Sequence, residues 1–154
     1  PCDVKKETID KELLHVKNKM KEEKFIAIGE IGIDLYWDKT TLNLQKEALI
    51  HQINLAKEYA LPIVIHVRNS FDETIEIVEK LNDKNLKGVF HCFTGTKEEA
   101  DRIIKLGKFY LGVGGVVTFK NSGLDKTISK IDMDYLILET DSPFLFKYGV
   151  PLVL

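Results

Sequence analysis

The sequence predicts an α/β fold with a parallel sheet, and three observations support this class. Five short apolar segments recur along the 154 residues, helical patterns separate them, and no linker or low-complexity segment interrupts the alternation. Regular alternation of strands and helices is typical of parallel sheets. No G-x-G-x-x-G fingerprint follows any of the five segments, which favours a (β/α) barrel over an open dinucleotide-binding sheet.

The five predicted strands are rich in Ile, Val, Leu and Phe. Their apolar residues are nearly continuous, and this is the pattern of strands buried on both faces of a sheet. The strands are expected over residues 25–30, 62–66, 88–91, 109–113 and 135–141.

Helices are predicted between these strands from apolar residues at helical spacing. The pattern is clear over residues 8–24 and 41–59 and weaker over 123–130. With no composition shift along the chain, residues 1–154 are expected to form a single domain.

Three helix ends are also marked in the sequence. Residues 70–73 (S-F-D-E) and 96–99 (T-K-E-E) both match the capping box, in which a hydroxyl and a carboxylate satisfy the first backbone N–H groups. Gly107 fits the residue of positive φ that commonly follows the last turn of a helix.

The composition is that of an ordinary globular protein, and it excludes a strongly basic nucleic-acid binder. The chain carries 22 basic and 24 acidic side chains, a net charge of -2, so any contact with nucleic acid must be local to a site. The two cysteines form no CxxC pair, and no apolar run approaches the length needed to span a bilayer. These features predict a cytoplasmic protein without a membrane partner.

Four of the five predicted strands finish on a side chain that binds metals. These residues are Glu30, His66, His91 and Asp141. Barrel enzymes collect their active-site residues at the C-terminal ends of the strands, and a mixed nitrogen and oxygen set suits zinc, manganese or a related divalent ion. Taken alone, each histidine is more often a hydrogen-bonded core residue and each carboxylate a turn cap. Recurrence on four strands favours a metal site.

Four sequence segments extend this interpretation, because they resemble the TatD family of metal-dependent deoxyribonucleases. Residues 29–34 read G-E-I-G-I-D and are similar to the family's G-E-x-G-L-D segment. Residues 65–68, 91–95 and 139–143 read I-H-V-R, H-C-F-T-G and E-T-D-S-P, and they match I-H-x-R, H-C-F-T-G and E-T-D-S/A-P in the same order. The resemblance runs from about residue 25 to 145.

The resemblance implies a TIM (β/α) barrel of which this chain holds about five of eight β/α units, without the first two strands and the last. The family's first strand carries an H-x-H pair, and no H-x-H occurs here. Pro1-Cys2 is similar to the end of the G-x-H-P segment that follows the family's second strand, and the residues from Phe146 onward do not match the family. We therefore expect this chain alone to be weakly active or inactive.

For the parent protein, the resemblance implies a two-metal phosphodiester hydrolase, most simply a DNase with 3'-5' exonuclease activity on single-stranded DNA. Glu30 would bridge two divalent ions (Zn, Mg or Mn), His66 and His91 would hold one, and Asp141 the other. Two ions clamp the attacking and leaving oxygens of an in-line displacement. Glu30 and Asp141 are therefore the expected catalytic residues, with Asp141 also orienting or deprotonating the attacking water.

Four neighbouring residues have two interpretations each. Arg68 binds a substrate phosphate through paired hydrogen bonds or forms a salt bridge with a helix, and the two are about equally supported. Asp34 orients a metal ligand by hydrogen bonding to it without binding the metal itself, which is slightly favoured, or shapes the turn after its strand. Tyr36 and Trp37 pack their loop, which is favoured, or stack on a nucleobase.

Two further functions remain alternatives to the nuclease. The missing H-x-H pair favours an inactive remnant of a barrel, and hydrolysis of another ester, such as D-aminoacyl-tRNA, is associated with the same family. No stable protein partner is implied, and the sequence leaves the native metal and the choice of DNA or RNA open.

Overall fold

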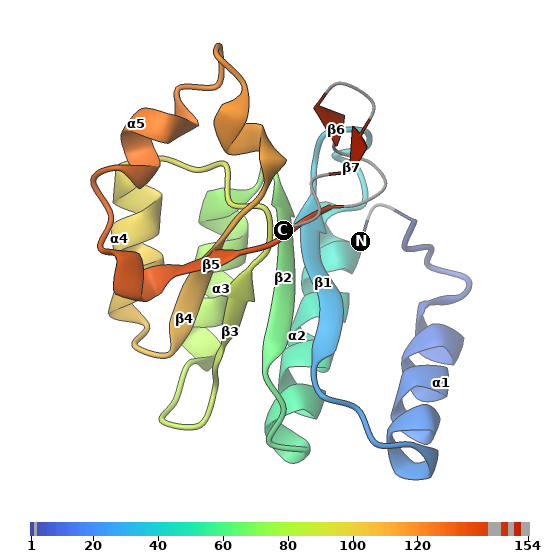
Figure 1. The fold of residues 1–154 in the computed structure, drawn as a ribbon. Helices are drawn as coiled ribbons and strands as arrows, with labels where there is room; N and C mark the ends of the chain where they lie inside the picture. The colour runs from blue at the N-terminus through green and yellow to red at the C-terminus, as the bar shows by residue number, and fades with distance from the viewer. Residues whose placement is uncertain (2, 142–145, 148–149, 152–154) are drawn as a thin grey trace. The chain divides into compact units, whose positions relative to one another are not determined.

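The computed structural model describes residues 1, 3–141, 146–147 and 150–151. The described chain divides into two compact units, Pro1–Gly88 and Val89–Leu154. Figure 1 follows the order of helices and strands along the chain. That the chain forms a single domain stays a prediction.

The first unit contains three helices and two strands. Parallel strands β1 and β2 pair with each other, α2 and α3 pack against them, and α1 packs on α2 (Figure 1). Fully buried isoleucines and leucines of both strands and of α2 form its core, as apolar strand and helix faces must be buried together. The elements are α1 (Ile9–Glu22), β1 (Ile28–Asp34), α2 (Leu42–Glu58), β2 (Ile63–Arg68) and α3 (Phe71–Leu81).

Strands β1 and β2 both run further than their apolar residues predict. The expected strand ends at Glu30 and His66 are wrong, because pairing continues through Gly32 opposite His66 to Asp34 opposite Arg68. Gly32 makes this possible: its φ is 142°, and a Cβ at this position would collide with the carbonyl oxygen of His66. The true C-terminal ends of the two strands are therefore Asp34 and Arg68.

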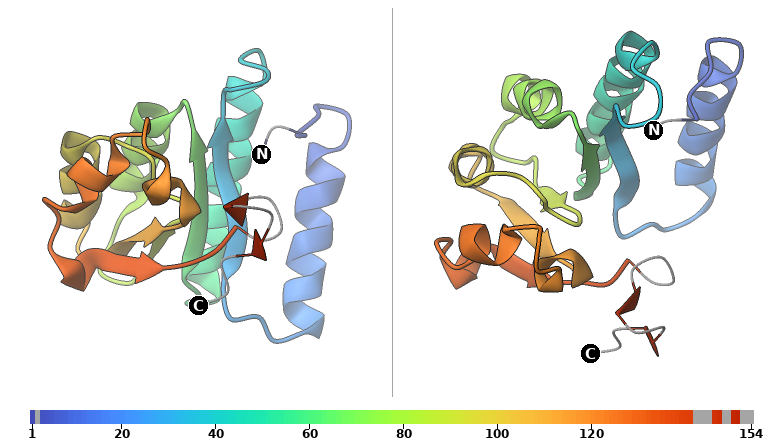
Figure 2. Two further views of the ribbon diagram at one scale, coloured as in Figure 1. Left: turned by 45° about the horizontal axis from the view of Figure 1, so that its top comes forward. Right: turned by 90° about the horizontal axis from the view of Figure 1, so that it is seen from above.

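The second unit is built around β4 and β5, which pair in parallel with Leu111 opposite Leu136. Helix α4 packs beside β4, and the backbone N–H of Phe93 donates to Gly112 O at 2.9 Å, so the chain after β3 runs along β4 (Figure 2). The elements that follow the boundary are β3 (Gly88–Phe90, which starts at the last residue of the first unit), α4 (Lys97–Lys105), β4 (Phe109–Val113), η1 (Gly115–Thr118), α5 (Leu124–Ile128), η2 (Met133–Tyr135), β5 (Leu136–Leu138), β6 (Phe146–Lys147) and β7 (Val150–Pro151).

The order of strands in the sheet follows the chain, β1-β2-β3-β4-β5. This confirms the predicted α/β class with a parallel sheet. Strand β5 differs from its prediction, since it is only three residues long and Ile137 and Leu138 are exposed, the latter to 69%. It lies at one end of the strand order, where it has a single strand neighbour within the described chain. Asp141 consequently follows β5 by three residues.

The helix-end predictions are confirmed in two cases and wrong in one. Thr96 and Glu99 form the capping box of α4, and Gly107 has a φ of 96° after that helix. Helix α3 does begin after Ser70, but the Ser70 hydroxyl makes no capping bond. It donates instead to Ile33 O at 2.5 Å, which fastens β1 to the start of α3. Within the described residues, no helix combines the length and apolarity needed to cross a bilayer.

Candidate functional site

His66 is the centre of a three-residue cluster in the first unit. It lies in β2, and its Nε2 is 3.0 Å from Asp34 Oδ2 while its Nδ1 is 3.8 Å from Glu30 Oε2. The Asp34 side chain is only 5% exposed, whereas that of Glu30 is 47% exposed. One ring nitrogen is therefore fixed by a buried carboxylate, and the other faces an accessible one.

Asp34 is itself held from several directions. Its Oδ1 accepts a hydrogen bond from the backbone N–H of Tyr36 at 2.9 Å. The buried side chain of Gln45 in α2 accepts from Asp34 N at 2.8 Å and donates to Asp34 O at 3.0 Å. A carboxylate fixed in this way holds the imidazole that it contacts, and the His66 ring then has Nδ1 on the side of Glu30.

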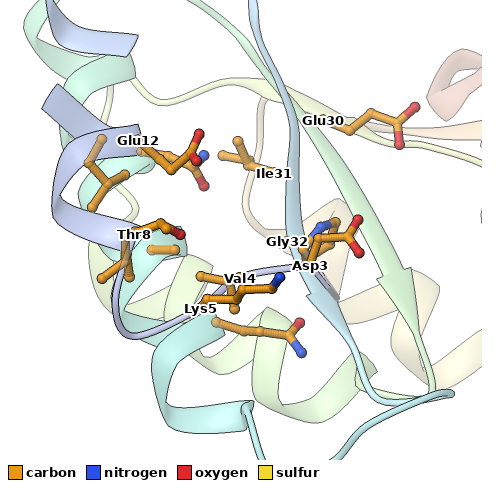
Figure 3. A pocket seen from close by; sticks show the side chains of 14 residues that line it. Asp3, Val4, Lys5, Thr8, Glu12, Glu30, Ile31 and Gly32 are labelled. Atoms are coloured by element: carbon orange, nitrogen blue, oxygen red, sulfur yellow. The ribbon is translucent and has the colours of Figure 1, made fainter. Parts of the chain in front are cut away.

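Glu30 also lies at the edge of a hollow in the first unit. This cavity of 310 Å³ is lined by the N-terminal segment, α1, α2 and β1. Figure 3 shows Glu30 across β1 from Thr8 and Glu12, with its carboxylate directed away from α1. The chemistry of Glu30 and His66 is therefore on the other side of the strand from the body of this cavity.

His91 is the centre of a matching cluster in the second unit. It directly follows β3, and its Nδ1 is 2.9 Å from Glu139 Oε2 while its Nε2 is 3.6 Å from Asp141 Oδ1. Glu139 is the more buried carboxylate, with 16% of its side chain exposed against 38% for Asp141. The pattern of the first unit recurs, with the two ring nitrogens exchanged.

Glu139 is a site residue to which sequence reasoning assigned no role. Besides contacting His91, its Oε1 accepts a hydrogen bond from the backbone N–H of Cys92. Cys92 has a positive φ of 46°, a conformation that costs energy for a residue with a Cβ. The Glu139 carboxylate lies against Gly112 of β4, where any Cβ would overlap it. The signal available in the sequence was its place in E-T-D, two residues before a predicted ligand.

The donor separations fit metal binding by each histidine–carboxylate pair. Two ligands about 2.1 Å from a tetrahedral ion are roughly 3.4 Å apart, and the observed separations are 3.8 Å for Glu30 and His66 and 3.6 Å for His91 and Asp141. No group of three or more potential ligands gathers among the described residues. Catalytic zinc sites use three protein ligands, so neither pair alone would complete such a site.

Arg68 makes a contact that neither sequence interpretation included. It is two residues beyond His66 in β2, so both side chains leave the same face of the strand. Its guanidinium carbon lies 3.6 Å from the centroid of the Tyr36 ring.

Ser142 and Pro143, the last two residues of the E-T-D-S-P segment, lie outside the described residues, as does Cys2.

Comparison with known proteins gives one consistent family. The family model described as TatD related DNase matches residues 1–150. Similar curated proteins include the uncharacterized metal-dependent hydrolase YabD of Bacillus subtilis, 43% identical over 137 residues, which are 88% of this chain and 53% of YabD. The 3'-5' ssDNA/RNA exonuclease TatD of Cronobacter sakazakii is 37% identical over 126 residues, 80% of this chain and 48% of that protein.

Solved structures agree with this assignment. The crystal structure of YJJV, a TatD homolog from Escherichia coli, superposes with a TM-score of 0.82 at 32% identity over 92% of this chain and 56% of YJJV. A hydrolase of the TatD family from Entamoeba histolytica gives a TM-score of 0.68, also at 32% identity, over 88% of this chain and 44% of that one. These likenesses confirm the predicted barrel class. The chain spans about half the length of the curated relatives it matches.

Proposed function

We propose a function from one premise: this chain belongs to the family of TatD-related DNases. On this premise, the chain supplies metal ligands to a hydrolase that cleaves phosphodiester bonds in nucleic acid. The observation that carries the proposal is the repeated histidine arrangement, in which His66 and His91 each lie between a shielded carboxylate and an accessible one. Structural histidines need one hydrogen-bond partner, whereas metal-binding histidines need an orienting partner and a second ligand.

The proposed ligands are the four residues expected from the sequence, Glu30, His66, His91 and Asp141. Their donor chemistry suits Zn or Mn, and the family resemblance implies two ions per complete site, with Mg as a further candidate. Bound ions would lower the pKa of water and neutralise charge on the phosphate. Asp34 is proposed to orient His66, and Glu139, an addition from the structure, to orient His91.

Asp141 has a second proposed role as the residue that accepts a proton from the attacking water. Its side chain is 38% exposed, so substrate and water can reach it. With one oxygen 3.6 Å from His91 Nε2, the carboxylate has a second oxygen for hydrogen bonding. Geometry of this kind is a requirement for a general base.

The proposed substrate is single-stranded nucleic acid, cleaved from the 3' end. One relative is named a 3'-5' ssDNA/RNA exonuclease, and it covers 80% of this chain. The near-neutral net charge of the chain gives no sign of strong bulk attraction to phosphates, so we place phosphate recognition on Arg68, whose side chain shares a strand face with His66. A cytoplasmic location stays a prediction.

The test is hydrolysis of an end-labelled single-stranded oligonucleotide by the complete protein that contains this chain, with each of the three ions and with chelator. We expect chelator-sensitive shortening from the 3' end that Glu30→Ala and Asp141→Ala each abolish. Glu98→Ala, which removes an exposed carboxylate from α4, is the matched control and should retain activity. Activity that survives in Glu30→Ala and Asp141→Ala would contradict the assignment. Absence of hydrolysis with every ion would instead contradict the nuclease function.

A further inference from the structure

Tyr36, Trp37 and Arg68 form a cluster on the surface of the first unit, and the proposed function uses only Arg68 of the three. Half of Tyr36 and 73% of Trp37 are exposed, so packing within the loop leaves a large part of both rings open to solvent. The rings meet edge to face, with centroids 4.7 Å apart and planes at 87°. Large aromatic side chains exposed together are informative because burial normally stabilises them.

The Arg68 side chain links the two rings to the end of β2. Its guanidinium carbon is 3.6 Å from the Tyr36 centroid and 5.9 Å from the Trp37 centroid. A guanidinium stacked on a ring keeps its N–H donors in the plane, where they can meet phosphate oxygens with paired hydrogen bonds. The cluster thus combines an aromatic surface with a planar cation.

The cluster is also fixed in place relative to His66. Asp34 accepts from the backbone N–H of Tyr36 with one oxygen and contacts His66 Nε2 with the other. The backbone N–H of Leu35 donates to Arg68 O at 2.9 Å. The loop that carries both rings is therefore fastened at its root to the strand that carries the proposed metal ligand.

We infer that Tyr36, Trp37 and Arg68 form a binding subsite for one nucleotide of a single-stranded nucleic acid, with the base stacked on Trp37 and a phosphate held by Arg68. Aromatic rings bind bases of any sequence by stacking, and arginine beside them adds both charge and a second planar surface. The inference rests on the proposed function and extends it. It separates a base-stacking contact from the cleavage site and predicts that substrates without bases bind poorly.

The experiment uses Trp37 as its own probe, because it is the single tryptophan of the chain. A short single-stranded oligonucleotide is titrated into the full chain in the presence of chelator, and tryptophan emission is recorded beside the anisotropy of a labelled oligonucleotide. We expect the oligonucleotide to quench Trp37, and an abasic oligonucleotide of equal length and charge to leave the emission unchanged. Binding in chelator makes the result independent of hydrolysis.

Three variants measure the contribution of each part by anisotropy. Trp37→Leu should weaken binding roughly 5- to 150-fold, the range for loss of one stacked base. Arg68→Lys, which keeps the charge but loses the planar group, should also weaken it. Tyr110→Leu removes an exposed ring from β4 in the other unit, and it is the matched control that should bind as the unchanged chain does.

Several outcomes would overturn the inference. Equal quenching by normal and abasic oligonucleotides would show phosphate attraction without stacking. Unchanged affinity in Trp37→Leu, with chelator-sensitive hydrolysis intact in the complete protein, would remove the subsite and leave the proposed function standing. A shift of Trp37 emission that depends on protein concentration alone would show that a second copy of the chain covers the rings.

Discussion

Replacement of Glu139 by glutamine tests the arrangement around His91 with a change of one atom. The carboxylate gives one oxygen to His91 Nδ1 at 2.9 Å and the other to the backbone N–H of Cys92. Glutamine has a single acceptor oxygen, so one of these two contacts must be lost. If the amide NH₂ meets His91, it favours the tautomer that carries its proton on Nε2, which cannot bind a metal. If it meets Cys92, two donors face each other at a residue of positive φ.

The expected magnitude follows from the loss of one hydrogen bond to a charged group. Such bonds contribute about 1.5–3 kcal/mol, and the lower end applies here because 16% of the Glu139 side chain is exposed to solvent. A loss near 1.5 kcal/mol corresponds to a decrease in Tm of about 3–6 °C for a chain of this size. Loss of a partner that orients a metal-binding histidine typically costs about 10- to 100-fold in metal affinity.

The assay compares Glu139→Gln with Glu98→Gln, the same chemical change at an exposed position of α4. Thermal unfolding is followed by circular dichroism, and Zn²⁺ affinity is measured by titration calorimetry. We expect a lower Tm, a lower affinity, or both in Glu139→Gln, and neither in Glu98→Gln. If the two variants were indistinguishable in both measurements, Glu139 would have no orienting role and our reasoning about His91 would be wrong.

Three other predictions use the same measurements. Gly112→Ala should displace the Glu139 carboxylate and lower the affinity for Zn²⁺, whereas Gly114→Ala, whose Cβ would make ordinary contacts with Cys92 Sγ at 3.6 Å and Glu139 O at 4.0 Å, should be tolerated; equal effects of the two substitutions would contradict the close fit at Gly112. Asp34→Asn should lower metal affinity by about 10- to 100-fold, and an unchanged titration would show that it does not orient its histidine. The side-chain hydrogen bond from Lys57 is the main cause that lowers the pKa of Asp83 from 3.8 to about 2. The ionised Asp83 carboxylate therefore stabilises the folded chain fully above its unfolded pKa of 3.8, and this stabilisation is lost as the pH falls through about 2. The Tm of Asp83→Asn should accordingly be lower than that of the unchanged chain near neutral pH, and the two should have the same Tm at a pH of about 2.

The sequence predicted the class of fold because its signals are local. Apolar segments and helical spacing located the strands and helices to within a few residues, and the capping box at Thr96 marked the start of α4 correctly. The extent of β1 could not be read from hydrophobicity. It depends on Gly32, whose missing Cβ lets the strand pass the His66 carbonyl and continue to Asp34.

The candidate site shows the same division between local and spatial information. Motifs indicated the residue types that bind metals, and each histidine does lie beside a predicted carboxylate ligand. Partners chosen by packing were not visible in the sequence. Ser70 resembles a helix cap but bonds to Ile33 O, and Glu139 looks like part of a motif until its two contacts with residues 91 and 92 are seen.

The central claim is that two of the four histidines bind divalent metal ions, and metal titration of single histidine variants tests it most directly. His15 and His51 lie on exposed faces of α1 and α2 and serve as matched controls. We predict that His66→Ala and His91→Ala each lower the affinity of the chain for Zn²⁺ or Mn²⁺ by roughly 10-fold or more, while His15→Ala and His51→Ala leave it unchanged. Equal affinity in all four variants, or loss confined to His15→Ala or His51→Ala, would contradict the account.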